Sequence, residues 1–274
     1  MDNNKLLSAK NDVIFRLFFA DERNQEFLIS FLKSVLRLPE EDYDQIEIAD
    51  PHLLREYPKD KLGIIDVKLH TKSRKAVHIE IQLSVTPDML KRIVFYDAKL
   101  ITEQLGSGDV YDTIKKVISI VITNEKLIQR SLGYHHRFTM YDAEAGVELT
   151  DLVEVNTLEL PKLPDGTDGT VLYDWARFIA AESEEELDMI AQRNPEVGKA
   201  AVKLVELSAD ERARYMYELR EKERRDLESQ KRWAVKQREF EFAKNMVADG
   251  EPVDKIMRYT GLAYEDIESL RVVD

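Results

Sequence analysis

Two segments, GIIDVKL at residues 63–69 and VHIEIQL at residues 77–83, have the composition of neighbouring β-strands. In each segment, β-branched and other apolar residues alternate with charged or polar ones. Successive side chains of a strand point to opposite faces, so the polar residues of each segment, including Asp66 in the first and Glu80 in the second, would gather on one face. Residues 71–75 between the segments are polar and basic, as is typical of a turn. The pattern therefore predicts a β-hairpin.

A closed hairpin would bring the carboxylates of Asp66 and Glu80 to one surface. Two carboxylates that meet in this way repel each other unless a cation lies between them, and a divalent metal ion is the usual solution. The hairpin is therefore a candidate site for a hard divalent cation. In the alternative interpretation, this face of the hairpin is simply exposed to water, which would also accommodate a charged side chain in an apolar strand.

Hydrophobic periodicity predicts further helices and strands around this hairpin. Helical patterns cover residues 12–19, 25–36 and 87–106, and strand patterns cover residues 46–48, 116–123, 134–141 and 152–160. Residues 116–123 are an almost continuous β-branched run, which is typical of a strand buried on both faces. The succession of strand, strand, helix and strand indicates an α/β fold in which the helix crosses over to a later strand.

Beyond this core, the sequence is helical. Residues 164–169 form a segment rich in proline, glycine and aspartate that is expected to be a linker. Residues 210–247 are expected to form one long helix of mixed charge, which does not keep the heptad repeat of a coiled coil. Near the C-terminus, Gly261 separates two short helical patterns. This pair would either bind DNA or pack as a helical hairpin, and acidic residues on its second helix favour packing.

Short motifs along the chain resemble those of one known family. They are NDVIFRLF at residues 11–18, IEIQ at 79–82, Arg92 with Tyr96, LELPKL at 158–163 and TGLAYEDI at 260–267. In this order they resemble the Rpn family of recombination-promoting nucleases and transposases, within the PD-(D/E)XK nuclease superfamily. The resemblance implies an α/β fold with a restriction-endonuclease-like mixed sheet flanked by helices. It suggests a nuclease-like domain at residues 1–165 and an all-helical region at 170–274, which would serve DNA positioning or assembly, including homo-oligomerisation.

In that superfamily, the acidic pair of the hairpin forms a metal site. The resemblance implies that Asp66, Glu80 and the backbone carbonyl of Ile81 hold Mg²⁺ or Mn²⁺, ions that prefer oxygen ligands. Gln82 stands where the wider superfamily has a lysine. An amide can orient a water molecule, but it cannot supply the positive charge of an ammonium group. Lys68, on the same expected face as Asp66, would return that charge to the site or would be an ordinary surface lysine.

The same resemblance makes Asp12 and Arg92 catalytic candidates. Asp12 would add an acidic group near the metal, or would only complement the dipole of the first helix. Arg92 and Tyr96 lie one helical turn apart and share a face. The resemblance suggests that this face looks toward the site, where Arg92 would contact a phosphate or pair with a carboxylate. An arginine that only supports the sheet is an equal alternative. His135 and His136 are adjacent in a strand pattern, so they point to opposite faces and cannot both join one site.

Composition limits the possible functions. The 274 residues include no cysteine, which excludes disulfides, thiolate zinc sites and cysteine nucleophiles. The sequence lacks both a long apolar run typical of a membrane span and the pattern of a secretory signal, so a cytoplasmic location is expected. The net charge of −13 argues against indiscriminate nucleic-acid binding, although residues 199–244 carry 13 Lys and Arg against 10 Asp and Glu.

The leading hypothesis is a Mg²⁺-dependent DNA endonuclease that hydrolyses phosphodiester bonds. Its partner would be DNA, and its chemistry would lie in the first 165 residues. The alternative is a catalytically impaired descendant that keeps the fold as a binding or assembly module. Gln82 and the acidic charge balance favour this second interpretation.

Overall fold

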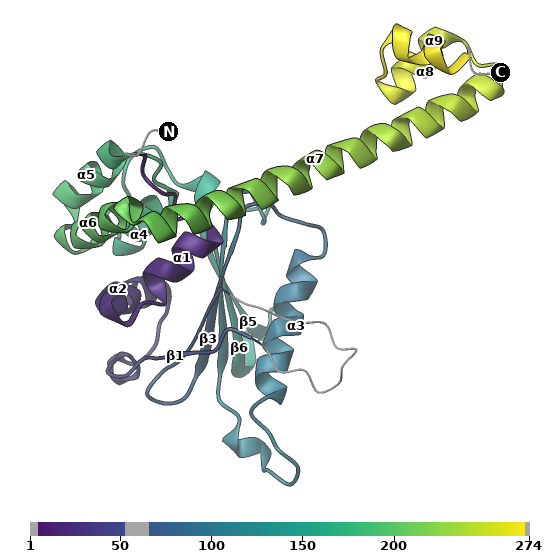
Figure 1. Ribbon diagram of the computed structural model, residues 1–274. Coiled ribbons are helices and arrows are strands. Elements are labelled where there is room, and N and C mark those ends of the chain that lie inside the picture. Colours follow the sequence, from purple (N-terminus) through teal and green to yellow (C-terminus); the bar gives the residue numbers. More distant parts are fainter. Residues whose placement is uncertain (1–4, 53–65, 272–274) are drawn as a thin grey trace. The chain divides into compact units, whose positions relative to one another are not determined.

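A computed structural model describes residues 5–52 and 66–271 of the chain (Figure 1). Residues 63–65 of the first expected strand lie outside these ranges. Six strands of the described part form one sheet in the order β1-β2-β3-β4-β6-β5. They are β1 (Glu47–Ala49), β2 (Val67–His70), β3 (Ala76–Gln82), β4 (Val117–Thr123), β5 (His135–Asp142) and β6 (Val147–Glu159). Strands β3, β4 and β6 are parallel and the other neighbours are antiparallel, which confirms the expected mixed sheet.

The expected hairpin is formed by β2 and β3, in a register that places Val67 opposite Ile79. Its turn is anchored by the buried carboxylate of Asp42. This group accepts hydrogen bonds from the backbone and side chain of Ser73 and one of 2.5 Å from Lys75. The anchored turn holds the register, and a shift by one residue would move every side chain of the strand to the opposite face.

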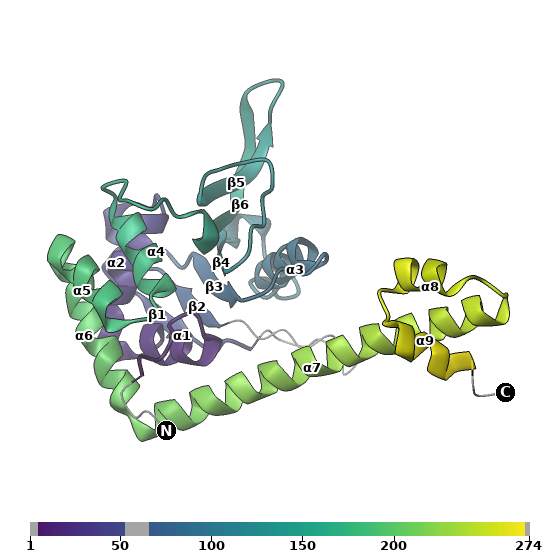
Figure 2. The ribbon, with the colours of Figure 1, turned by 90° about the horizontal axis from the view of Figure 1, so that it is seen from above.

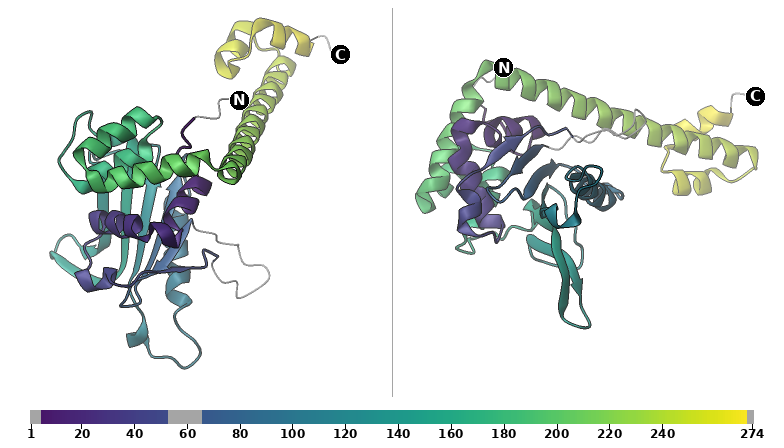
Figure 3. Two further views of the ribbon diagram at one scale, coloured as in Figure 1. Left: turned by 60° about the vertical axis from the view of Figure 1, so that its left-hand side comes forward. Right: turned by 90° about the horizontal axis from the view of Figure 1, so that it is seen from below.

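Different helices cover the two faces of the sheet. Helix α3 (Met89–Thr102) packs on one face, where it contacts Ala76, Val117 and Val121. The other face belongs to a larger core that includes α1 (Asp12–Phe19), α2 (Gln25–Val35), α4 (Val171–Ala180), α5 (Glu184–Arg193) and α6 (Pro195–Ala209). Figures 2 and 3 show these helices and α3 on opposite sides of the sheet. Because both of its faces are covered, β4 is buried along its whole length, as expected.

Short 3₁₀ turns complete the first part of the chain. They lie at Glu22–Asn24, Glu40–Tyr43, Tyr111–Thr113 and Leu160–Lys162. The first follows α1 and leads directly into α2, so these two helices are joined by a tight connection. Among the described residues, no helix is both long enough and apolar enough to cross a lipid bilayer.

Aromatic side chains form the centre of the larger core. Trp175 of α4 is fully buried, and its ring centroid lies 5.9 Å from that of Phe19, 6.1 Å from that of Phe31 and 5.4 Å from that of Phe178. Its indole N–H donates a hydrogen bond of 3.1 Å to the hydroxyl of Ser30 in α2. The buried polar atom of the indole is thus paired, as close packing of a tryptophan requires.

The chain divides into two compact units, Met1–Tyr217 and Glu218–Asp274. Helix α7 (Glu211–Ala248) closely matches the expected helix at 210–247 and contains the boundary between them. The expected division between residues 165 and 170 falls instead in the loop between β6 and α4. Since α4, α5 and α6 pack on the core of the sheet, the first compact unit continues beyond that loop. A functional division near residue 165 stays a prediction.

In the second unit, α8 (Val253–Thr260) and α9 (Tyr264–Arg271) pack with the end of α7 as a helical hairpin. Their common core consists of Ala243, Met246, Ile256, Leu262 and Ile267. Gly261 ends α8 in the left-handed region, with φ of 69°, which glycine adopts without steric cost.

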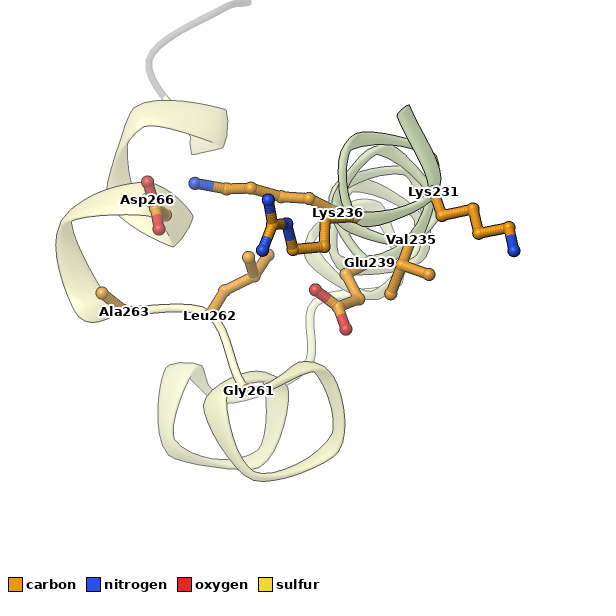
Figure 4. A pocket seen from close by; sticks show the side chains of 9 residues that line it. Lys231, Val235, Lys236, Glu239, Gly261, Leu262, Ala263 and Asp266 are labelled. Atoms are coloured by element: carbon orange, nitrogen blue, oxygen red, sulfur yellow. The ribbon is translucent and has the colours of Figure 1, made fainter. Parts of the chain in front are cut away.

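A groove of about 530 Å³ lies in the second unit (Figure 4). It is lined by three cations of α7, Lys231, Arg232 and Lys236, and also by the carboxylates of Glu239 and Asp266. The groove is therefore mixed in charge and lacks the uniformly basic character of a surface that follows a phosphate backbone.

We expect Trp175→Ala to lower the free energy of unfolding by about 3–5 kcal/mol, because it leaves a large cavity among three phenylalanines. Trp233→Ala is the matched control, because the other tryptophan of the chain is 66% exposed. Its truncation should change the free energy of unfolding by less than about 0.5 kcal/mol. Urea denaturation followed by circular dichroism measures both values, and equal effects would contradict the described core.

Candidate functional site

The two acidic residues of the hairpin lie side by side. Asp66 comes directly before β2, and its Oδ2 accepts a hydrogen bond of 2.7 Å from the backbone N–H of Ile81 in β3. Glu80 precedes Ile81 on β3 and is almost fully buried. Continuing the register of the hairpin by one residue beyond Val67 and Ile79 places Asp66 opposite Glu80. Asp66 therefore lies at the end of the paired segment next to Glu80, whose side chain is on the face of the sheet that α3 covers.

The electrostatics of Asp66 reflect this crowding. Burial is the main reason why the pKa of Asp66 is raised to about 7, and the negative charges of Asp12 and Glu80 act in the same direction. The hydrogen bond from Ile81 and the positive charge of Arg16 oppose the change. An ordinary aspartate has a pKa of about 3.9. At neutral pH, ionisation of Asp66 is therefore costly unless a cation joins it.

Glu80 has a comparable environment. Burial raises its pKa, the charges of His78 and Arg92 lower it, and the charge of Asp97 raises it. The Nη2 atom of Arg92 lies 3.6 Å from Oε2 of Glu80, which is an ion-pair distance but longer than a hydrogen bond. This Oε2 is buried and accepts no hydrogen bond from any residue that the structure describes. The carboxylate therefore retains a buried acceptor oxygen whose nearest cation is the guanidinium of Arg92.

Helix α3 presents Arg92 and Tyr96 to the carboxylates. Arg92 lies near Glu80, as the ion-pair distance shows. Burial raises the pKa of Tyr96, and the negative charges of Glu80 and Asp66 contribute to the increase. The shared face of these two α3 residues thus looks toward Asp66 and Glu80, as expected. The participation of Arg92 in catalysis stays a prediction.

Asp12 lies in the first turn of α1 and also close to the site. The preceding residue, Asn11, caps the helix, because its side chain accepts hydrogen bonds from the N–H groups of Val13 and Ile14. Asp12 is therefore not needed as the cap. Its charge is near enough to raise the pKa of Asp66. Both expected roles, a favourable charge at the helix start and an acidic group near the site, are compatible with this position.

Gln82 and Lys68 occupy different surroundings. Gln82 is the last residue of β3 and is half-buried, on the same face as Glu80. Its backbone carbonyl accepts a hydrogen bond of 3.1 Å from the backbone N–H of Asn124. Lys68 had been expected either to serve the site or to be a solvated surface lysine; the second expectation is wrong, and the first stays a prediction. Its Nζ lies 2.9 Å from Oε2 of Glu103, just beyond α3, and both side chains are largely buried.

The residues present suit a hard divalent cation. Mg²⁺ is commonly held by one or two carboxylates and keeps several water ligands, and Mn²⁺ also accepts oxygen donors. Asp66 and Glu80 provide such oxygens, and Oε2 of Glu80 is buried and accepts no hydrogen bond from the described residues. Within residues 5–52 and 66–271, no three His, Asp or Glu side chains form a ready-made metal cluster. The ion would therefore complete its shell with a backbone oxygen, such as that of Ile81, and with water.

Sequence reasoning missed a buried network next to this site. His78 of β3, Asp97 of α3 and Ser119 of β4 contact one another, and all three are almost fully buried. A signal was present in the sequence, because Ser119 is the one polar residue inside the apolar run 117–122. A polar residue in a strand covered on both faces needs a buried partner. The pattern could not name that partner.

The ELPK motif organises a loop at the same end of the sheet. Oε2 of Glu159 accepts hydrogen bonds from the backbone N–H groups of Leu127, at 2.7 Å, and Ile128, at 3.1 Å, and it lies 2.7 Å from Nζ of Lys162. Leu127 and Ile128 belong to the loop that follows β4. The loop begins beside the end of β3, where the backbone N–H of Asn124 donates a hydrogen bond to the backbone carbonyl of Gln82. The role of this motif in the described structure is to fix that loop.

The adjacent histidines behave as expected. His135 lies 3.2 Å from the side chain of Asn156, whereas His136 lies 3.3 Å from Glu159. Asn156 and Glu159 project from opposite faces of β6, so the two imidazoles also point to opposite faces.

A mixed sheet with helices on both faces, and with two acidic residues close together at the end of a hairpin, fits the fold and site of the PD-(D/E)XK class. The family model of the PD-(D/E)XK nuclease family transposases matches residues 9–234, so this chain belongs to that family. No curated protein and no solved structure gives a significant match. The match confirms the family that the sequence motifs had indicated.

Asp66 makes the stability of the metal-free protein depend on pH. Its pKa is about 7 in the folded chain and about 3.9 for an ordinary aspartate, so the folded state binds this proton more tightly than the unfolded state. The stability that this group contributes is fully present below about pH 4 and is lost as the pH rises through about 7.

We expect Asp66→Asn to remove this dependence. In EDTA, the variant should match the wild-type melting temperature near about pH 4 and exceed it at about pH 8, because the amide cannot ionise. Thermal unfolding followed by circular dichroism measures both. A wild-type advantage at the higher pH would contradict the arrangement of charges around Asp66.

Proposed function

We propose that this protein is a metal-dependent DNA endonuclease that hydrolyses phosphodiester bonds. Membership of the PD-(D/E)XK nuclease family transposases supports a nuclease-related activity. The single observation that carries the finer proposal is the proximity of Asp66 and Glu80 at the end of the hairpin. Within the described part of the chain, a buried carboxylate oxygen of Glu80 also accepts no hydrogen bond.

Asp66, Glu80 and the backbone carbonyl of Ile81 would hold Mg²⁺ or Mn²⁺. When bound, such an ion polarises a phosphate oxygen and lowers the pKa of a water nucleophile. The protein would contribute the fixed positions of the two carboxylates, which the hairpin register and the 2.7 Å bond from Ile81 to Asp66 maintain. Asp12 would add negative charge next to Asp66 and so increase the attraction for the cation.

Gln82 and Arg92 would handle the substrate. The amide of Gln82, on the same face as Glu80, would orient the attacking water but could not accept its proton. Arg92 lies beside Glu80, and its guanidinium would turn to a phosphate oxygen once Glu80 is engaged with the cation. In this arrangement, Arg92 supplies the positive charge that the lysine provides elsewhere in the superfamily.

We expect the wild-type protein to nick supercoiled plasmid in Mg²⁺ or Mn²⁺ and not in EDTA. Glu80→Gln should reduce the rate by at least about 100-fold, because the amide keeps the shape but loses the charge that binds the ion. Agarose-gel assays of plasmid relaxation, run with each metal, measure the rates.

Glu154→Gln is the matched control for that experiment. Glu154 is also a buried carboxylate of the sheet, but it lies on the face away from α3, opposite Ile118, and is paired with Lys116 and Arg137 at 2.8 Å each. Its loss should reduce stability and leave the cleavage rate of the folded protein within about threefold. Wild-type nicking by Glu80→Gln would sink the assignment of the site.

Gln82 and the net charge of −13 favour a second candidate, a catalytically impaired descendant that uses the fold for binding or assembly. The same assay separates the two candidates. An impaired protein would leave the plasmid intact with every metal, and Glu80→Gln would then make no difference.

A further inference from the structure

Three buried polar side chains connect α3 to the two strands beneath it. Nε2 of His78 lies 2.9 Å from Oδ1 of Asp97 and 2.5 Å from Oγ of Ser119. The Ser119 hydroxyl also donates a hydrogen bond to the same oxygen of Asp97. His78 and Ser119 have no exposed surface, and Asp97 is 2% exposed. The network is thus closed from solvent and joins β3, β4 and α3.

The geometry excludes a hydrolytic Ser-His-Asp triad. In such a triad, the serine and the aspartate bind different nitrogens of the imidazole, and the serine faces the substrate. In this network, Ser119 and Asp97 both approach Nε2 of His78 and contact each other. The Nδ1 atom of His78 is buried and has no hydrogen-bond partner in the described chain. Since no substrate can reach Ser119, the network must act on the structure around it.

The position of the network relates it to the candidate metal site. His78 lies two residues before Glu80 on the same face of β3, and Asp97 directly follows Tyr96 on α3. Apart from this network and the ion pairs of Arg92 with Glu80 and of Glu103, just beyond the helix, with Lys68, α3 rests on the sheet through apolar contacts of Met89, Ile93 and Leu100. Apolar contacts are not directional and tolerate small displacements, whereas hydrogen bonds to Asp97 hold a defined distance and angle.

A network of this kind is costly in stability alone. A buried carboxylate and a buried imidazole lose their hydration, and their attraction often only offsets that loss. A well-packed apolar set at the same place would stabilise α3 at least as well. The retained polar groups therefore indicate a requirement for position rather than for stability.

We propose that the His78–Asp97–Ser119 network is a positioning device that sets α3 on the sheet so that Arg92 and Tyr96 face the Asp66–Glu80 site. The residues of the network do not touch the substrate, and they act through Arg92. The proposal rests on the proposed function, because the placement of Arg92 matters for cleavage only if cleavage occurs at that site.

A double-mutant cycle tests this role. Asp97→Ala should lower kcat for a DNA duplex by about 10–100-fold and change KM by less than about threefold, because a small misplacement of a catalytic group is costly. Arg92→Ala should have a similar effect. The double variant should be no more than about twofold slower than the slower single variant, since Asp97 acts through Arg92.

Glu154→Gln serves again as the control for loss of a buried ion pair. In the double variant of Glu154→Gln and Arg92→Ala, the fold-reduction in kcat should equal the product of the two single effects, because Glu154 lies on the other face of the sheet. If the effects of Asp97→Ala and Arg92→Ala also multiply, the positioning role is wrong and the network is only structural.

Hydrogen exchange provides a readout that does not depend on cleavage. Asp97→Ala should increase amide exchange in α3 (Met89–Thr102), while Glu154→Gln should leave α3 unchanged. Unchanged α3 exchange in Asp97→Ala would overturn the proposal. If the wild-type protein does not cleave DNA, the proposed function fails, and hydrogen exchange alone then decides whether the network holds α3.

Discussion

The antiparallel pairing of β2 with β3 is the constraint on which the site depends. The register that places Val67 opposite Ile79 leaves Asp66 beside Glu80, and the hydrogen bond from Ile81 to Asp66 closes the pairing at that end. At the other end, Asp42 anchors the turn. With both ends held, two acidic residues that are separated by 13 others in the sequence lie close together.

This arrangement is electrostatically unbalanced, and a comparison within the same sheet shows how. Glu154 is also buried, but hydrogen bonds from Arg137, Lys116 and Asn156 outweigh the effect of burial and hold its pKa at about 2. The carboxyls of Asp66 and Glu80 have raised pKa values. Burial and neighbouring negative charge raise these values by more than the hydrogen bonds and positive charges near the two groups lower them. Within the described sheet, the charge of Glu154 is thus neutralised by neighbouring side chains, whereas Asp66 and Glu80 lack comparable compensation. A divalent cation is the group that would complete the pair.

Local pattern predicted much of the fold. Alternating residues predicted the hairpin that brings Asp66 close to Glu80, and the apolar run at 116–123 predicted the buried strand β4. The spacing of Arg92 and Tyr96 predicted that both look the same way. In each case, the periodicity of the element determines the direction of a side chain, so the sequence contains the answer.

Partners from distant segments could not be predicted in the same way. Lys68 pairs with Glu103, and Ser119 meets Asp97 and His78, because the crossover from β3 through α3 to β4 brings these residues together. A pattern gives the face on which a residue lies but not the side chain that packs opposite. Packing after the loop at residues 164–169 is a related case: α4, α5 and α6 follow this loop, yet their apolar residues belong to the core that includes the sheet.

The most direct measurement is anomalous diffraction from crystals soaked in MnCl₂. We expect one anomalous peak between Asp66 and Glu80, with carboxylate oxygens of both at about 2.0–2.3 Å and Arg92 displaced from Glu80. A structure without a peak at this position, in which Arg92 still lies against Glu80 at saturating Mn²⁺, would contradict the assignment of a cation site to the hairpin.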